Sequence, residues 1–142
     1  MSAKYSLLLL LFLLGVVSCH TSYVSIIEVV PAEAAVTAHG LTPAEVERAM
    51  ALFASFAHDE GFRLEEREWE QRGDTVRALH ATKDYSPSLH VDLVEDAFAI
   101  QVFLYTFSGG QPDPFKALVE HIRRFYADEF GSERVVVRLM SQ

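Results

Sequence analysis

Two histidines and an aspartate, His80, His90 and Asp92, have the residue types and spacing that could bind a metal ion or a small polar ligand. They lie in two short alternating segments on either side of a turn-forming stretch at Tyr85. If these segments pair as antiparallel strands about Tyr85, His80 faces His90 with a Cβ separation of roughly 5 Å. Zinc usually takes three or four ligands, and Asp92 would be the third. A one-residue shift would separate the histidines, and a solvated or partner-facing surface is the simpler alternative.

Aromatic side chains are expected on the same face of the sheet as the histidines. A turn before the following strand puts Gln101, Phe103 and Tyr105 on that face, and Trp69 joins it from another strand. A face that only contacts water would be more polar, since exposed apolar patches tend to mark interfaces. We therefore expect it to be covered by a partner protein, by a second copy, or by the chain's own segment 23–30. The candidate binding residues, to which we assign no metal, are Trp69, His80, His90, Asp92, Gln101, Phe103 and Tyr105.

The chain is acidic, and part of its acidity is concentrated in one segment. Glu66, Glu68 and Glu70 share one side of an extended stretch and could attract a cation or a basic partner. An edge strand protected by charge explains them more simply. The net charge of −8 argues against nucleic-acid binding, which depends on neutralising phosphates with Lys and Arg. The expected binding surface is therefore an acidic, aromatic sheet face that would suit a basic protein.

Two amphipathic helices are predicted to support this sheet. Residues 42–45, Thr-Pro-Ala-Glu, form a capping box with proline at the first helical position, and Gly61 ends that helix. Asp113 and the proline after it begin the second helix, which ends at Gly131. Apolar residues recur at helical spacing in both. The predicted buried stripes are Val46, Ala49, Met50, Phe53, Phe56 and Ala57 in the first helix, and Phe115, Leu118, Val119, Ile122 and Tyr126 in the second.

The remaining periodic segments alternate as strands do. The predicted element order is α-β-β-β-β-α-β, which favours an α+β fold with two helices packed on one face of a mostly antiparallel five-stranded sheet. We expect residues 41–142 to form this single domain, and residues 19–40 to be a tether in which the β-branched segment 23–30 could add an edge strand. The five strands are expected at 62–71, 75–82, 89–93, 98–107 and 134–139.

The N-terminus has the pattern of an export signal. After the single charge of Lys4, residues 7–17 are an unbroken apolar run, too short for the roughly 20 residues of a membrane-spanning helix. The run ends in Val16-Val17-Ser18-Cys19, which resembles the lipobox of bacterial lipoproteins. An ordinary secretory signal that leaves a free cysteine is the alternative.

The resemblance implies that residues 1–18 are a signal peptide and that Cys19 becomes the acylated first residue of the mature protein. Several acyl chains give durable attachment to a lipid bilayer, at roughly 0.8 kcal/mol for each buried CH₂ group. Cys19 is the only cysteine, so no disulfide within the chain is possible and lipidation would consume the thiol. In this family an aspartate after the cysteine often signals inner-membrane retention. His20 in that place favours the periplasmic side of the outer membrane over the inner membrane.

These observations predict a lipid-anchored protein of the bacterial cell envelope that binds another envelope or secreted protein. We expect no catalysis and no cofactor, because no serine lies in a nucleophile-elbow context and Ser108-Gly109-Gly110 lacks the lysine of a phosphate-binding loop. The alternative function is a small-ligand or metal-binding envelope protein that uses His80, His90 and Asp92.

Overall fold

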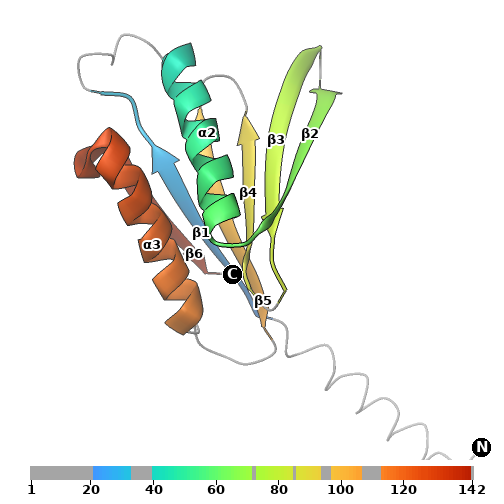
Figure 1. The fold of residues 1–142 in the computed structure, drawn as a ribbon, viewed down its shortest axis with the longest axis vertical. Coiled ribbons are helices and arrows are strands. Elements are labelled where there is room, and N and C mark those ends of the chain that lie inside the picture. The colour runs from blue at the N-terminus through green and yellow to red at the C-terminus, as the bar shows by residue number, and fades with distance from the viewer. Residues whose placement is uncertain are drawn as a thin grey trace, which may run out of the picture.

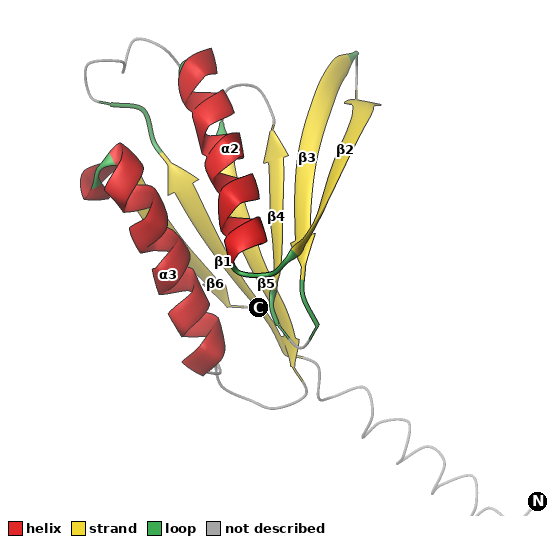
Figure 2. Ribbon diagram, viewed as in Figure 1, coloured by secondary structure: helices red, strands yellow, loops and turns green. Residues whose placement is uncertain are grey.

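The computed structural model describes residues 21–32, 40–71, 73–84, 86–93, 97–106 and 113–141. The lipobox and signal peptide lie outside this part of the chain, as do Tyr85 and the side chain of Tyr105. Two helices cover one face of a six-stranded sheet (Figures 1 and 2). Within the described ranges, no helix is long and apolar enough to cross a membrane.

The sheet has the strand order β2-β3-β4-β5-β1-β6, and all five pairings are antiparallel. The α+β class is confirmed, but the sheet has six strands instead of the expected five, and a strand precedes the first helix. The strands are β1 (Thr21–Val29), β2 (Arg63–Gln71), β3 (Asp74–Thr82), β4 (Ser88–Leu93), β5 (Phe98–Thr106) and β6 (Val135–Ser141). The helices are α2 (Pro43–Asp59) and α3 (Asp113–Phe130), with a short 3-10 helix, η2 (Ser132–Arg134), before β6.

The first strand is the main departure from the sequence prediction. The idea that segment 23–30 adds a strand is confirmed, but its expected place at an edge is wrong. β1 lies inside the sheet and pairs with β5 on one side and β6 on the other. The side chains of Tyr23, Ile27 and Val29 are buried, because alternate residues of β1 face the helices. The folded part of the chain therefore begins no later than Thr21.

Both helices begin and end as their sequences predict. The capping box is present: the Glu45 amide donates to Thr42 Oγ1 (3.3 Å), and the Thr42 amide donates to Glu45 Oε2 (2.9 Å). Gly61 and Gly131 follow the two helices with φ angles of 73° and 94°, a left-handed conformation that glycine adopts without strain.

The core lies between the helices and the sheet. The predicted stripes face it, and Phe130 extends the stripe of α3. The Tyr126 hydroxyl donates to the Ala49 carbonyl (2.8 Å), which ties α3 to α2, and burial raises the pKa of Tyr126 well above its usual value. The largest fully buried side chains of the core include Phe53, Phe98, Phe115, Ile27, Ile100, Ile122 and Tyr126.

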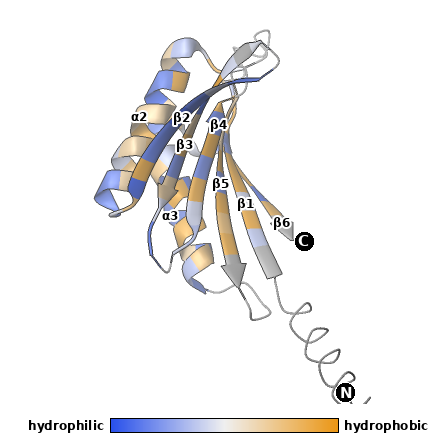
Figure 3. Ribbon diagram, turned by 90° about the vertical axis from the view of Figure 1, so that its right-hand side faces the viewer, coloured by the Kyte–Doolittle hydropathy of each residue, from blue (hydrophilic) through white to orange (hydrophobic). Residues whose placement is uncertain are grey.

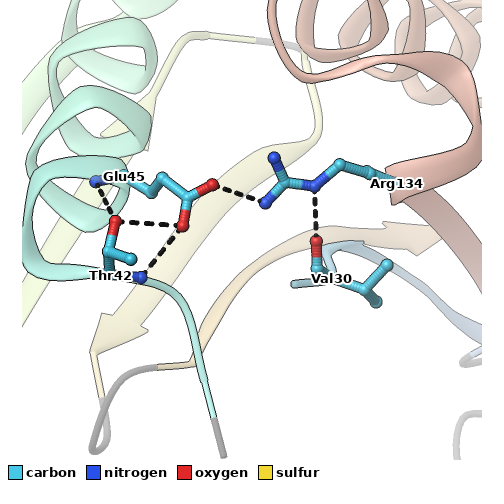
Figure 4. Close-up of polar contacts among 4 residues, drawn as sticks. All are labelled: Val30, Thr42, Glu45 and Arg134. Carbon is cyan, nitrogen blue, oxygen red and sulfur yellow. Dashed lines mark hydrogen bonds and ion pairs between the residues drawn. The ribbon is translucent and has the colours of Figure 1, made fainter. Parts of the chain in front are cut away.

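Arg134 joins three elements where β1 ends and β6 begins (Figure 4). Its Nε donates to the Val30 carbonyl (2.9 Å), and its Nη2 donates to Glu45 Oε1 (2.7 Å). The same carboxylate closes the capping box of α2. The pKa of Glu45 is therefore lowered, first by the hydrogen bond from the Thr42 amide and next by the one from Arg134.

Candidate functional site

The face of the sheet opposite the helices is called the open face below. Both helices lie on the other side of the sheet (Figure 3), and residues opposite each other in antiparallel strands share a face. The predicted pairing about Tyr85 is confirmed, because Leu79 pairs with Val91 and Ala81 with Leu89. One row of the open face crosses all six strands as Glu65, His80, His90, Gln101, Ile26 and Arg138. The next row of described side chains is Arg63, Thr82, Ser88, Phe103 and Val24.

The two histidines meet as predicted. The ring centroids of His80 and His90 are 4.4 Å apart and the ring planes are inclined by 47°. His90 Nε2 lies 3.1 Å from Ser88 Oγ, within hydrogen-bond distance. Partial burial lowers the pKa of His90, the nearby His80 lowers it further, and Asp92 acts in the opposite direction. The arrangement therefore favours a neutral His90 at pH 7.

The third expected ligand does not complete a metal site. Asp92 is exposed and pairs with Ala78, one row away from the histidines. Across the described ranges, no group of three or more His, Cys, Asp or Glu side chains could hold a metal ion. The geometry leaves a histidine pair with Gln101 beside it in the next strand, which suits hydrogen bonding to a polar group more than metal binding.

The aromatic candidates do not form one cluster. Phe103 is half-buried on β5, beside the row of the histidines, whereas Trp69 lies on β2 and is 40% exposed. Two strands, β3 and β4, separate them. Tyr105 pairs with Ser22 of β1 in the backbone register, and its side chain lies outside the described part of the chain. The candidate residues on β4, β5 and β1 therefore lie together, whereas Trp69 lies apart from them.

The open face is not acidic, so that expectation is wrong. It carries three arginines and three carboxylates among its described side chains, and two of these pairs form ion pairs: Arg67 with Glu65 (3.0 Å) and Arg138 with Glu28 (2.9 Å). The glutamates at 66, 68 and 70 belong to the other face of β2, because strand residues alternate between faces. The centre of the open face is instead apolar, with Val24 and Ile26 of β1 next to Phe103.

The open face has no internal cover among the residues that the structure describes. Segment 23–30, which was one candidate for that cover, is built into the sheet and supplies part of the face. Gln101 at its centre is exposed. These β1 residues were not among the predicted site residues, although the β-branched run of the segment was the signal that could have identified them.

The two edges of the sheet differ in composition. Every residue of β2 is exposed, and six of the nine are charged. In β6, Leu139 is 63% exposed and Val136 is 36% exposed, and Arg138 is the one charged residue. A groove of about 240 Å³ runs between β6 and α3, and its lining residues are Phe115, Lys116, Val119, Glu120, Arg123, Val137 and Leu139.

Comparison with known proteins places the chain in no established family: no family model, curated protein or solved structure matches it.

Proposed function

We propose that this protein is a bacterial envelope lipoprotein, anchored in the bilayer through acylated Cys19, and that it binds another envelope or secreted protein through its open face. The observation that carries the second part is the position of β1 inside the sheet. It removes the chain's own segment as a cover and adds Val24 and Ile26 to an apolar centre beside Phe103. A face of this kind is typical of protein interfaces, in which an apolar centre is surrounded by polar groups.

The polar groups around the apolar centre would favour a partner with complementary hydrogen-bonding and charged groups. His80, His90 and Gln101 offer hydrogen-bonding groups on one side of the apolar centre, and the Arg138–Glu28 ion pair lies on the other. The net charge of −8 favours a basic partner, which the acidity of the whole protein would attract over a distance. The open face itself supplies shape and hydrogen bonding more than charge.

The second candidate is an envelope protein that binds a metal ion or a small polar ligand. It is favoured by one observation, the 4.4 Å separation of the His80 and His90 rings. A metal carrier should gain thermal stability in zinc or copper by linkage, and should lose that gain in His90→Ala. An interaction module should melt at the same temperature with and without metal.

The anchor is tested by the intact mass of the protein recovered from the membrane fraction. We expect a mass equal to residues 19–142 plus acyl chains. Cys19→Ala should accumulate as an uncut, unlipidated precursor. A mutant that still matures and floats with membranes would exclude the lipobox interpretation.

The binding face is tested with a photo-crosslinking residue placed in the native protein. We expect a probe at Gln101 to give a defined crosslinked partner in living cells. A matched probe at Lys116, which is also exposed but lies on α3, should not give that product. The same partner captured from both positions, or from Lys116 alone, would contradict a role for the open face.

A further inference from the structure

The distance along the chain between the lipid anchor and the folded domain is very short. β1 begins at Thr21, two residues after Cys19. A fully extended chain spans at most about 3.6 Å for each residue, so the Cα atoms of Cys19 and Thr21 are no more than roughly 7 Å apart. We infer that the end of the sheet where β1 begins, the near end, rests directly on the lipid bilayer. This inference depends on the proposed acylation of Cys19.

β1 cannot be released to serve as a flexible tether. It is held by antiparallel pairing with β5 over its whole length, and with β6 from Tyr23 onwards. Tyr23, only its third residue, is buried, and its ring centroid lies 6.1 Å from that of Phe115 in α3. Detaching even the first three residues would remove an aromatic side chain from the core. The strand that follows the proposed anchor is therefore held in the sheet and the core.

The antiparallel topology determines which other segments lie at the near end. β3 and β5 run towards it and end at Thr82 and Thr106, and α3 begins beside it at Asp113 (Figure 1). The opposite, or far, end is where β1 ends at Val29. The far end lies roughly 27 Å from the near end, because the nine residues of β1 advance by about 3.4 Å for each step.

The charges at the two ends agree with this orientation. Among the described side chains of the terminal helical turns, the terminal strand residues and the connections, the near end has three basic and four acidic residues. The far end has one basic and seven acidic residues. An anionic bilayer would repel the far end more strongly, since each unit charge near its surface counts for about 1 kcal/mol. The residues are Arg63, Lys83, Lys116, Asp59, Glu60, Asp84 and Asp113 at the near end, and Arg134, Glu28, Glu45, Glu70, Asp92, Asp128, Glu129 and Glu133 at the far end.

The upright position constrains how partners approach. Strands that rise from the bilayer expose the open face and both sheet edges sideways, to neighbours attached to the same membrane. A second copy cannot pair antiparallel along β6 there, because the two-fold axis would put its own anchor at the opposite end. A partner that approaches from the side away from the bilayer would meet the acidic far end.

The test uses the lipidated protein in vesicles that contain a spin-labelled lipid headgroup. Cys19 is consumed by acylation, so one introduced cysteine can be labelled alone with a fluorophore. Asp84→Cys and Thr75→Cys are matched sites, because both residues are exposed, Thr75 near the start of β3 and Asp84 in the turn after its end. We expect several-fold greater loss of fluorescence at residue 84 than at residue 75.

A linker variant provides the control. A 20-residue Gly/Ser insertion between His20 and Thr21 would add an average reach of about 25 Å, and should reduce quenching at residue 84 to nearly that at residue 75. Equal quenching at the two sites in acylated protein without the linker would contradict the contact of the near end with the bilayer, and would leave the acylation of Cys19 unaffected. An intact mass without acyl chains would contradict the acylation of Cys19, and with it the contact of the near end with the bilayer.

Discussion

The two edge strands of one sheet carry opposite surface chemistry. β2 presents charges on both faces, and none of its nine residues is buried. β6 exposes Val136 and Leu139, carries a single charge, and lies next to an apolar groove against α3. An edge strand exposes unpaired backbone groups, and charged side chains are a common means of preventing another strand from adding to it.

The difference indicates that association is blocked at one edge and left open at the other. On its helix side, β2 also takes part in an ion-pair network, in which Arg77 contacts both Glu47 of α2 (3.0 Å) and Glu66 of β2 (3.1 Å). Beside β6, Glu120 is paired with both Arg123 and Arg124, which lower its pKa to about 2. Both edges have one unpaired side, but β6 combines it with mainly apolar side chains, whereas six of the nine residues of β2 are charged.

The largest effect on stability should come from comparing a buried residue in β1, the strand beside the β6 edge, with an exposed residue in the β2 edge. Ile27 in β1, the neighbour of β6, is fully buried, whereas Leu64 in β2 is 38% exposed. Ile27→Ala should lower the free energy of unfolding by about 2–5 kcal/mol, through lost burial and a cavity. Leu64→Ala should change it by about 0.5 kcal/mol. Urea unfolding measures both, and equal losses would mean that the two sides of the sheet are packed alike.

The second effect concerns association at the β6 edge. In protein without acyl chains, made with Cys19→Ser and an ordinary secretion signal, two copies can pair through β6 about a two-fold axis at Val137. That register places Val135 opposite Leu139 of the other copy. Leu139→Lys should weaken self-association at least about tenfold, because two leucines leave the interface.

Leu64→Lys on β2 is the matched control and should leave this association unchanged. Analytical ultracentrifugation over a range of concentrations measures it. If the parent protein stays monomeric throughout, or if both substitutions act equally, the two edges do not differ in the way proposed.

The third effect compares the ion-pair networks associated with the two edges. The side chains of Arg134 and Glu45 are 15% and 26% exposed, against 37% and 56% for Arg77 and Glu66. Glu45→Ala should cost about 1–2 kcal/mol of unfolding free energy, because it also removes half of a capping box. Glu66→Ala should cost no more than about 0.5 kcal/mol. Because the pKa of Glu45 is lowered in the folded state, its contribution is complete above the usual glutamate pKa and is lost as the pH falls below it.

The smallest effect lies midway between the edges, in β4. The folded state lowers the pKa of His90, so the unfolded chain binds a proton more readily. Stability should therefore decrease as the pH falls from 7 through the usual histidine value of about 6.5, and level off below the lowered pKa.

His90→Gln should remove this part of the pH dependence of the melting temperature. His58→Gln should retain it, because the His58 side chain is 90% exposed at the end of α2. A steeper loss of stability in His90→Gln would mean that the sign of the His90 shift is wrong.

Local patterns in the sequence predicted the local structure. The Thr42–Glu45 capping box, both helical stripes and the cross-strand meeting of His80 with His90 depend on residues close together in the chain, and all are present. The histidine register could be derived because a short connection and one-sided burial together determine which residues pair.

Strand order could not be derived in the same way. The partners of β1 lie far along the chain: Thr21 pairs with Thr106, and Val29 with Val135. Nothing local distinguishes an inner strand from an edge strand in a β-branched segment. The expected acidic face failed for a related reason, since the glutamates of β2 alternate with arginines and fall mainly on the helix side.

The position of β1 also governs when the chain can fold. β1 precedes the other described strands and needs β6, which follows them, because Tyr23 pairs with Ser141 more than a hundred residues later. Such non-local pairing slows folding, since the loop must close before the contacts form. The core cannot be completed while the C-terminus is still being synthesised or translocated. Under the proposed export and lipid attachment, the chain would stay unfolded during passage until β6 emerges, and its sheet would then form beside the bilayer.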